Sequence, residues 1–399
     1  MIDLGGTFRA LEPKDTLKKI EPMLWEKFGI TRVANITGLD DINIPTYVAI
    51  RPHSKFFSTS QGKGINHDLA KISALMESIE GWHAENLTKP HLFGAYDQLK
   101  NKHNVVDIEV ISSSFFKIPY EKMRAYEIPW MKGTELNNGH EIYFPMDLIN
   151  LDFVACNDLD NFGLSLFPPT SNGLASGNSY EEALCHAIYE VIERHCWYKS
   201  ELAPLRYVDL TTIQSSHLRT LMEHLDSKSI RCQFVDMTDE INVPAYMATL
   251  TDLTGVHAVG SFCGAGAHLS SEVALSRAIT EAIQSRLTII GGSREDIFPS
   301  VYRDIRRAAR NTQDVSDVKA QHPFVETRMP SDFTQCIELT LHRLKQAGYD
   351  QVIVYNHTKE DIGIPVVHVL IPGLQFNVLH HNHYAYSPDE FLDLGGDHA

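Results

Sequence analysis

The sequence predicts a single integrated unit of the mixed α/β (α+β) class, in which mixed or antiparallel sheets carry the helices. Three observations lead to this prediction. Short alternating stretches rich in β-branched and aromatic residues are interspersed with longer amphipathic stretches of helical period. No low-complexity tract or long linker divides the 399 residues. One plan, a glycine turn followed by an amphipathic helix, occurs three times along the chain.

The N-terminal part is expected to begin with an entry segment and to end with the first repeated helix. Residues 14–28 have a helical apolar period, and Pro22 is expected to kink or split that helix. Residues 30–36 and 45–58 alternate as strands do. The first acidic helix is expected at about residues 68–87, after a glycine turn.

The rest of the chain alternates between further strands and helices. The expected strands span residues 105–111, 142–145, 231–236, 245–250, 257–262, 350–356 and 365–372. The expected helices span about residues 179–202, 210–227, 264–286 and 333–347. We expect three parts: residues 1–58 as entry segment and first strands, residues 59–374 as the core, and residues 375–399 as a polar tail.

The central helix carries an unusual set of charged residues. Ser179 can cap it, with Glu182 at the spacing of a capping box. Glu190, Glu193 and Arg194 follow at i, i+3 and i+4, so their side chains project side by side. On this copy alone, a solvated helix face is the simpler interpretation, and a site for Mg²⁺ and a polyphosphate is the alternative.

Residues 62–80 and 264–286 repeat the plan of this helix, which favours the functional interpretation. A gapless alignment of the three stretches gives two columns of alanine and two columns of acidic or amide residues. The alanine columns are Ala70, Ala183 and Ala274, and Ala74, Ala187 and Ala278; the acid columns are Glu77, Glu190 and Glu281, and Glu80, Glu193 and Gln284. Small residues let helices approach closely, so we expect the acid columns to face one cavity. Three matching copies indicate a functional acid cluster.

Composition excludes several classes of partner and location. The net charge of −16 argues against a nucleic acid partner, which needs a basic surface, although a local ATP site is compatible with it. The six cysteines include no CxxC pair, as expected for a reducing cytoplasm. No signal peptide and no apolar stretch of membrane-spanning length is present, so we expect a cytoplasmic protein without membrane contact.

Several single residues leave two interpretations open. Lys63, in the sequence QGKG, does not fit a P-loop and belongs to a tight turn or contacts a phosphate. Asn178 either caps the central helix or reaches a phosphate or Mg²⁺. Arg286 is either a cation at a helix C-terminus or a phosphate contact. His186 and His195 border the acid flank, where a packed or hydrogen-bonded role is favoured over that of a base. The tail residues His380, His381 and His383 are more typical of a polar tail than of a metal site.

Taken together, these motifs resemble the YcaO family. They are Ser60 to Glu80, Ser171 to Arg194 and Ala278 to Arg286, with a closing segment from Ile364 to Leu374 that resembles the end of many members. The similarity runs from about Lys14 to Leu374, which is most of the chain.

The resemblance implies an ATP-binding fold without Walker motifs, in which ATP and Mg²⁺ lie between the acid-bearing helices. Members use ATP to phosphorylate the oxygen of a peptide backbone amide, and a nucleophile then attacks the amide carbon. The metal ligands implied here are Glu77, Glu80, Glu190 and Glu193, of which Glu190 and Glu193 are also the implied catalytic residues. The implied nucleotide contacts are Lys14, Asn178, Glu182, Arg194 and Arg286.

Two departures from the family pattern narrow the expected reaction. Gly81 stands where some relatives carry Arg, and the PxPxP ending of azoline-forming members is missing. Members without that ending often act with a TfuA-type partner and form thioamides, so we expect a thioamide-forming enzyme with a TfuA-like partner. The alternatives are an azoline-forming cyclodehydratase with a partner resembling ubiquitin-activating enzymes, a macrocyclic amidine former, and a non-catalytic ATP-binding accessory to ribosomal-protein methylthiolation. A homodimer is plausible for the family.

Overall fold

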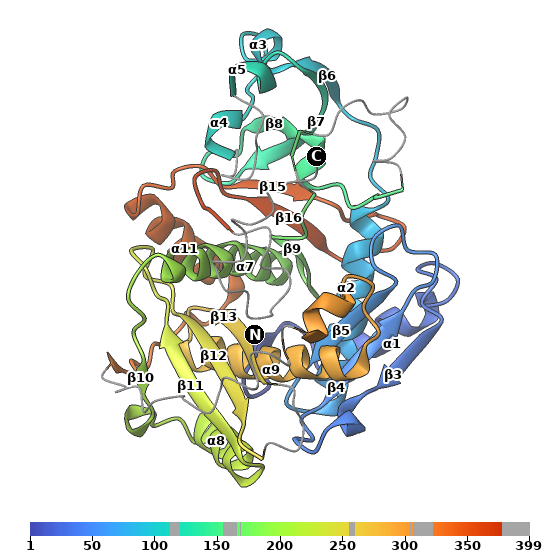
Figure 1. Ribbon diagram of the computed structural model, residues 1–399. Coiled ribbons are helices and arrows are strands. Elements are labelled where there is room, and N and C mark those ends of the chain that lie inside the picture. The colour runs from blue at the N-terminus through green and yellow to red at the C-terminus, as the bar shows by residue number, and fades with distance from the viewer. Residues whose placement is uncertain are drawn as a thin grey trace, which may run out of the picture.

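The computed structural model describes residues 1–111, 120–154, 166–167, 169–254, 260–303, 305 and 322–376, and it has the mixed architecture expected (Figure 1). Three larger sheets are built mainly from antiparallel strands. The first has the order β3 (Arg32–Asn35), β4 (Thr46–Ile50) and β5 (Thr59–Lys63). The second has the order β11 (Ile230–Asp236), β12 (Ala245–Asp252) and β13 (Ser261–Ala267).

The third sheet is the largest and joins distant parts of the chain. Its order is β6 (Leu92–Ala95), β7 (Glu127–Glu135), β15 (Ile353–Asn356), β16 (Val366–Leu370) and β9 (Leu174–Ser176), with β8 (Glu141–Pro145) also paired to β7. Two small pairs complete the strands: β1 (Ile2–Asp3) with β2 (Phe8–Arg9), and β10 (Val208–Asp209) with β14 (His322–Pro323).

Three long helices, α2 (His67–Ala84), α7 (Tyr180–Glu201) and α9 (Ser271–Gly291), are the repeated helices predicted from the sequence. Each follows the strand β5, β9 or β13 and packs on it. Each also contacts the strand of the next unit, so that α2 meets β9, α7 meets β13 and α9 meets β5. The repeat is therefore a closed ring of three units, and Figure 1 shows the three helices around the N-terminal residues. The other helices are α1 (Pro13–Ile20), α3 (Tyr96–Leu99), α4 (Ile108–Ile111), α5 (Tyr120–Met123), α8 (Ser216–Ser227) and α11 (Phe333–Gln346).

The N-caps of the three long helices fall at equivalent positions of the gapless alignment. Asn66, Ser179 and Ser270 each accept the backbone N–H of the residue three positions later. This shared cap satisfies an amide that would otherwise have no partner in the first turn. The predicted cap at Ser179 is confirmed, and the equivalence shows that the alignment is structurally correct.

The glycines that mark the repeat lie in strands more often than in turns. Gly62 lies in β5, and Gly264 and Gly266 lie in β13. The prediction of a glycine turn is therefore wrong for Gly62 and for the third unit, whereas Gly64 and Gly177 directly follow β5 and β9.

The strand glycines are required because helix and strand backbones nearly touch. A Cβ atom added at Gly62 would lie 2.0 Å from the amide nitrogen of Ala74 and 2.3 Å from the carbonyl oxygen of Ala70. At Gly266 it would lie 2.1 Å from the carbonyl oxygen of Ala274. A methyl group has no room at such distances, so glycine faces the alanine columns. This close approach brings each helix to the centre of the ring.

Most of the other predicted elements are present, with shifted ends. Pro22 splits the first helix as expected, because α1 ends at Ile20 and a 3₁₀ turn follows at Glu21–Met23. The strand expected at residues 105–111 is wrong, because α4 occupies its second half. There the Asp107 carboxylate accepts the N–H of Glu109 at 3.0 Å and starts a helical turn.

Two other features complete the description of the chain. The boundary expected after residue 58 falls between β4 and β5, which pair with one another, and α2 packs on both strands. None of the described helices is long and apolar enough to cross a membrane.

Candidate functional site

A cavity of about 460 Å³ opens at the centre of the ring. All six residues of the two acid columns line it: Glu77, Glu80, Glu190, Glu193, Glu281 and Gln284. Residues far apart in the sequence, on three different helices, therefore meet in one place. The geometry is the one that the repeat predicted.

The later acid of a unit holds the strand of the next unit. Glu80 Oε1 accepts the backbone N–H of Ser176 at 2.8 Å and its hydroxyl at 2.6 Å. Glu193 Oε2 accepts the backbone N–H of Ala267 at 3.0 Å. Ser176 and Ala267 end β9 and β13 at equivalent positions. Each of these carboxylates is thus fixed in direction by the backbone of the neighbouring unit while it lines the cavity.

The acids carry strongly perturbed pKa values. Burial raises the pKa of Glu80 to about 7 and that of Glu190 to about 8, and the neighbouring carboxylates add to both shifts. Burial also raises the pKa of Glu193. The Glu77 side chain is exposed at the cavity wall, where the close surrounding of its carboxylate by protein atoms, together with the charge of Glu281, raises its pKa to about 7. Crowded carboxylates of this kind are stabilised by a bound cation, and their oxygens are the donors that Mg²⁺ prefers. The residues present therefore fit a magnesium site.

The acid of the third helix is already paired with cations. Lys63 donates to Glu281 in a short ion pair between β5 and α9. Arg194 lies between two helices, with its guanidinium 3.8 Å from Glu193 Oε1 and 4.0 Å from Glu281 Oε1. The acid pairs of α2 and α7 are thus the better metal ligands, and α9 differs from them.

Glu182 and Asn178 hold the N-terminal segment against the start of α7. The buried Glu182 carboxylate accepts the N–H of Ala10 at 2.9 Å and the N–H of Asn178 at 3.2 Å, and it pairs with Arg9 at 3.5 Å. Thr16 donates its hydroxyl to Asn178 Oδ1 at 2.8 Å. The N-terminal residues are therefore part of the cavity wall.

Four arginines line the cavity without having been predicted: Arg9, Arg51, Arg277 and Arg294. Arg277 stands four residues before Glu281 on α9, so helical spacing alone would have placed it on the same face. Arg9 gives no such signal, because a hairpin outside the repeat brings it in. Its guanidinium lies 2.6 Å from His186 Nε2.

Two residues expected to contact the nucleotide do not line the cavity. Lys14 is exposed on α1. Arg286 is 2% exposed and forms ion pairs with Asp40 and Asp252, each at 3.1 Å. The two carboxylates neutralise this arginine inside the protein, where it joins three segments.

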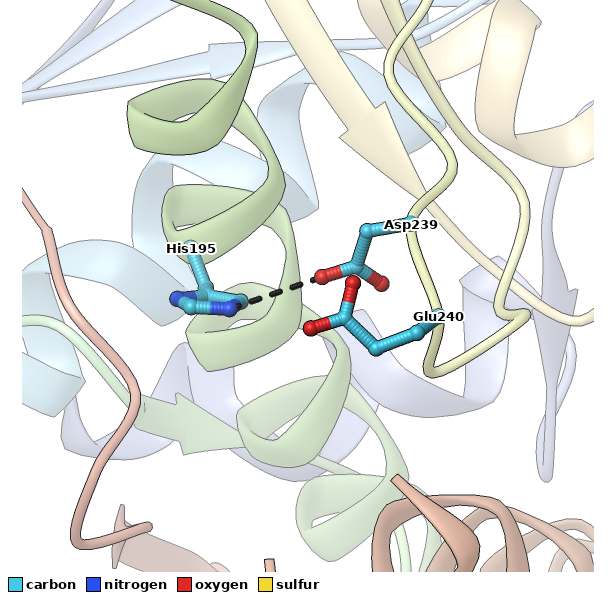
Figure 2. A group of neighbouring side chains, drawn as sticks. All are labelled: His195, Asp239 and Glu240. Atoms are coloured by element: carbon cyan, nitrogen blue, oxygen red, sulfur yellow. Dashed lines mark ion pairs between the residues drawn. The ribbon is translucent and has the colours of Figure 1, made fainter. Parts of the chain in front are cut away.

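A second group of side chains has the spacing of metal ligands within the described ranges: His195, Asp239 and Glu240 (Figure 2). His195 Nε2 lies 3.4 Å from Asp239 Oδ2, and the backbone N–H of Gln375 donates to His195 Nδ1 at 3.0 Å. Because Nδ1 accepts, the proton of the neutral ring is on Nε2, which leaves no lone pair there for a metal.

Lys199 already supplies a positive charge to this second group, since its ammonium lies 2.6 Å from Glu240 Oε1. The group is therefore an ion-pair cluster that ties residue 375 to α7, in keeping with the hydrogen-bonded role expected for His195. The histidines at positions 380, 381 and 383 lie outside the described residues.

Comparison with known proteins identifies the family. The family model described as YcaO cyclodehydratase, ATP- and Mg²⁺-binding, matches residues 61–375. A protein of Rhizobium leguminosarum bv. trifolii, described as lying in the tfuA 3′ region, is 30% identical over 93% of this chain and 89% of its own. A protein of Methanothermobacter thermautotrophicus is 30% identical over 92% of this chain and 95% of its own.

Solved structures agree with this result at the level of the fold. YcaO from Methanopyrus kandleri, bound with AMPPCP and Mg²⁺, has a TM-score of 0.71 at 21% identity and covers 96% of this chain and 97% of its own. A heterocyclase in complex with substrate and cofactor has a TM-score of 0.75 at 20% identity over 92% of this chain. This chain spans about half of that heterocyclase, 53%. The predicted family, fold class and cofactors are confirmed: the chain belongs to the YcaO family, and it is an ATP-dependent, peptide-modifying enzyme that uses ATP and Mg²⁺.

Proposed function

We propose that this enzyme activates a backbone amide of a peptide by phosphorylating its oxygen, and that sulfide then replaces that oxygen to give a thioamide. The balanced reaction consumes one ATP and one sulfide and releases ADP and phosphate. ATP supplies the phosphoryl group that makes the amide oxygen a leaving group, and Mg²⁺ offsets the charge of the triphosphate. The observation that carries the proposal is the meeting of two acid pairs from different helices in one cavity.

The residues have distinct roles in this proposal. Glu77 and Glu80 on α2, with Glu190 and Glu193 on α7, would hold Mg²⁺. Their raised pKa values mean that a cation must displace protons from them near neutral pH, so metal binding should strengthen as pH rises.

Another set of residues would contact the nucleotide. Arg194 lies beside both Glu193 and Glu281, where its charge can compensate phosphate oxygens. Asn178 and Glu182 hold the N-terminal segment as one wall of the nucleotide site. We leave Lys14 and Arg286 out of this set because neither lines the cavity.

The choice of thioamide chemistry and of a TfuA-like partner is supported by one relative. The Rhizobium protein is described by its position in the tfuA 3′ region, which suggests that the two genes act together. We propose a TfuA-like protein as the sulfide-delivering partner and leave the homodimer as a prediction for size-exclusion measurements.

The azoline-forming reaction is the second candidate, because the matching family model is described as a cyclodehydratase. One experiment separates the candidates. The protein is incubated with ATP, Mg²⁺, sulfide, a TfuA-like protein and a precursor peptide, and the peptide is analysed by mass spectrometry. Replacement of oxygen by sulfur supports the thioamide. Loss of water without sulfur supports the azoline instead. ATP binding with no hydrolysis under any of these conditions would indicate an accessory role.

A further inference from the structure

The central cavity extends beyond the acid columns along two of the long helices. The proposed nucleotide wall lies at the start of α7, where Glu182 stands in the first turn. On α9, however, the lining continues to Thr288, seven residues and about 10 Å past Glu281. On α2 it continues past both acids to Gly81. The cavity therefore has a second end, which is lined by the later turns of α2 and α9.

Three phenylalanine side chains line this second end. They are Phe56 and Phe57, from the loop between β4 and β5, and Phe153, and we call them the aromatic lip. The ring centroid of Phe56 lies 4.2 Å from that of Phe57 and 5.0 Å from that of Phe153, which it meets edge to face. All three side chains are only partly buried. Aromatic rings gathered in a cavity and left partly open to solvent are typical of a binding site.

We propose that the aromatic lip binds an apolar side chain of the peptide substrate, next to the amide that is activated. It then selects peptides with an aromatic or large aliphatic residue at that place. This inference rests on the proposed function. The occupant is the peptide because one continuous cavity joins the rings to the acids that would hold Mg²⁺. Since the amide oxygen must reach the terminal phosphate there, the neighbouring residues of the peptide must also lie against the cavity wall.

A buried ion pair fixes the aromatic lip relative to the acids of α2. Arg51 and Glu85 are 3% and 4% exposed, and two guanidinium nitrogens of Arg51 donate to the carboxylate of Glu85. This carboxylate also accepts the hydroxyl of Ser54 at 3.0 Å and the backbone N–H of Lys55 at 2.9 Å. The backbone N–H of Phe153 donates to the carbonyl oxygen of Lys55 at 3.2 Å. Because Glu85 directly follows α2, the same helix positions the lip and two of the proposed metal ligands.

Charged side chains beside the aromatic lip are paired with one another, which favours an apolar ligand. The Arg294 guanidinium lies 5.5 Å from the ring centroid of Phe57 and donates to both carboxylate oxygens of Asp296. Lys55 Nζ lies 2.6 Å from Asp152 Oδ2. A charged side chain of the peptide would lose hydration against the rings, where these counter-charges are already engaged. An apolar side chain loses nothing in the same place and gains burial.

The test measures how the protein discriminates among short peptides. The probes are acetylated and amidated pentapeptides, Gly-Gly-Xaa-Gly-Gly, in which Xaa is Phe, Leu, Ala or Glu. Their dissociation constants are measured by ligand-observed NMR on the full chain with Mg²⁺ and a non-hydrolysable ATP analogue. We expect the wild type to bind the Phe and Leu probes about ten- to hundredfold more tightly than the Ala probe, the effect of burying one large apolar side chain. The Glu probe should bind no better than the Ala probe.

The variants remove one ring of the aromatic lip. Phe57→Ala should reduce the preference for the Phe and Leu probes to less than about threefold, because the apolar contact is lost. Phe57→Leu keeps an apolar side chain and loses the ring, so its affinity for the Phe probe should lie between those of the wild type and Phe57→Ala. Phe93→Ala is the matched control, since Phe93 is 59% exposed on β6 and is not among the residues that line the cavity. Melting curves show whether each variant is folded.

Each alternative result has a definite meaning. A wild type that binds all four probes equally, or binds none of them, contradicts the inference, and so do equal losses in Phe57→Ala and Phe93→Ala. If Phe57→Ala does not fold, Phe57→Leu decides: weaker binding of the Phe probe supports the inference, and unchanged binding contradicts it. A protein that prefers the Phe probe but never hydrolyses ATP with a precursor peptide would instead contradict the proposed function.

Discussion

The α7 unit and the α9 unit have the same construction and different chemistry. In both, a strand is followed by a long helix with a serine N-cap. The α7 unit then presents the pair Glu190 and Glu193, whereas the α9 unit presents Glu281 with Gln284. This difference indicates that all three helices are needed to form the ring. Only two of them need to carry metal ligands.

The largest predicted effect separates these two units. Glu190→Ala should reduce ATP turnover by about a thousandfold or more, because the metal loses a ligand where charge is transferred. Glu281→Gln should reduce it by about tenfold at most, because Glu281 is neutralised by Lys63 rather than bound to a metal. Steady-state phosphate release measures both variants, and equal losses would contradict the division between α7 and α9.

A stability difference should follow from the closer packing of the α9 unit. The strand position that holds Gly266 in β13 holds Ala175 in β9, so a methyl group is tolerated only beside α7. We expect Gly266→Ala to lower the free energy of unfolding by about 3 kcal/mol or more, since the helix must move away. Gly38→Ala, where nothing lies within 4 Å of the added atom, is the matched control. Denaturant titration measures both, and a Gly266→Ala protein as stable as the control would show that the approach can relax.

The start of α9 should also make folding pH-dependent. His268 stands at the position of Gly177 in the α7 unit, and burial, together with the charges of Arg277 and Arg9, lowers its pKa to about 3. The unfolded histidine binds a proton below about pH 6.5 and the folded one does not, so stability is present above that pH and is lost as pH falls.

For this one residue we expect about 2 kcal/mol of lost stability between pH 6.5 and 4.5. The wild type should therefore lose stability relative to His268→Asn, which can still accept the N–H of Ser270, as the pH falls through this range. Parallel pH profiles for the two proteins would assign the dependence to other groups.

The smallest predicted effect comes from a substitution that gives α9 the same acid pair as α2 and α7. Gln284→Glu gives the third helix an acid pair, and the added carboxylate should weaken ATP binding by about tenfold through repulsion of the phosphates. A metal held by the new pair would instead strengthen ATP binding at high Mg²⁺. Titration calorimetry at two Mg²⁺ concentrations distinguishes these results.

The sequence alone was enough to predict that the acidic side chains meet in one place, but it was not enough to predict the positions of several arginines. The alignment of three local patterns placed Glu77, Glu190 and Glu281 together, because helix period and repeat length are both local information. Arg9 could not be predicted in this way, since its position depends on a hairpin that docks from outside the repeat. The resemblance implied a nucleotide contact for Arg286, and its ion pairs with Asp40 and Asp252 could not be predicted because both partners are distant in sequence.

The glycines show a second limit of local information. Gly62 and Gly264 were interpreted as turns, because a pattern of glycines is the same whether the backbone reverses or another backbone approaches it closely.

Ser176 donates its backbone N–H to Glu80, and Ala267 donates its own to Glu193. These hydrogen bonds between units have a consequence for any attempt to divide the protein. A fragment that kept one long helix would retain its carboxylates but lose the backbone amides that aim them. Cleavage between two units should therefore abolish ligand binding in both pieces. Nucleotide, in turn, should protect peptide bonds throughout the whole ring from proteolysis, far beyond those near the phosphates.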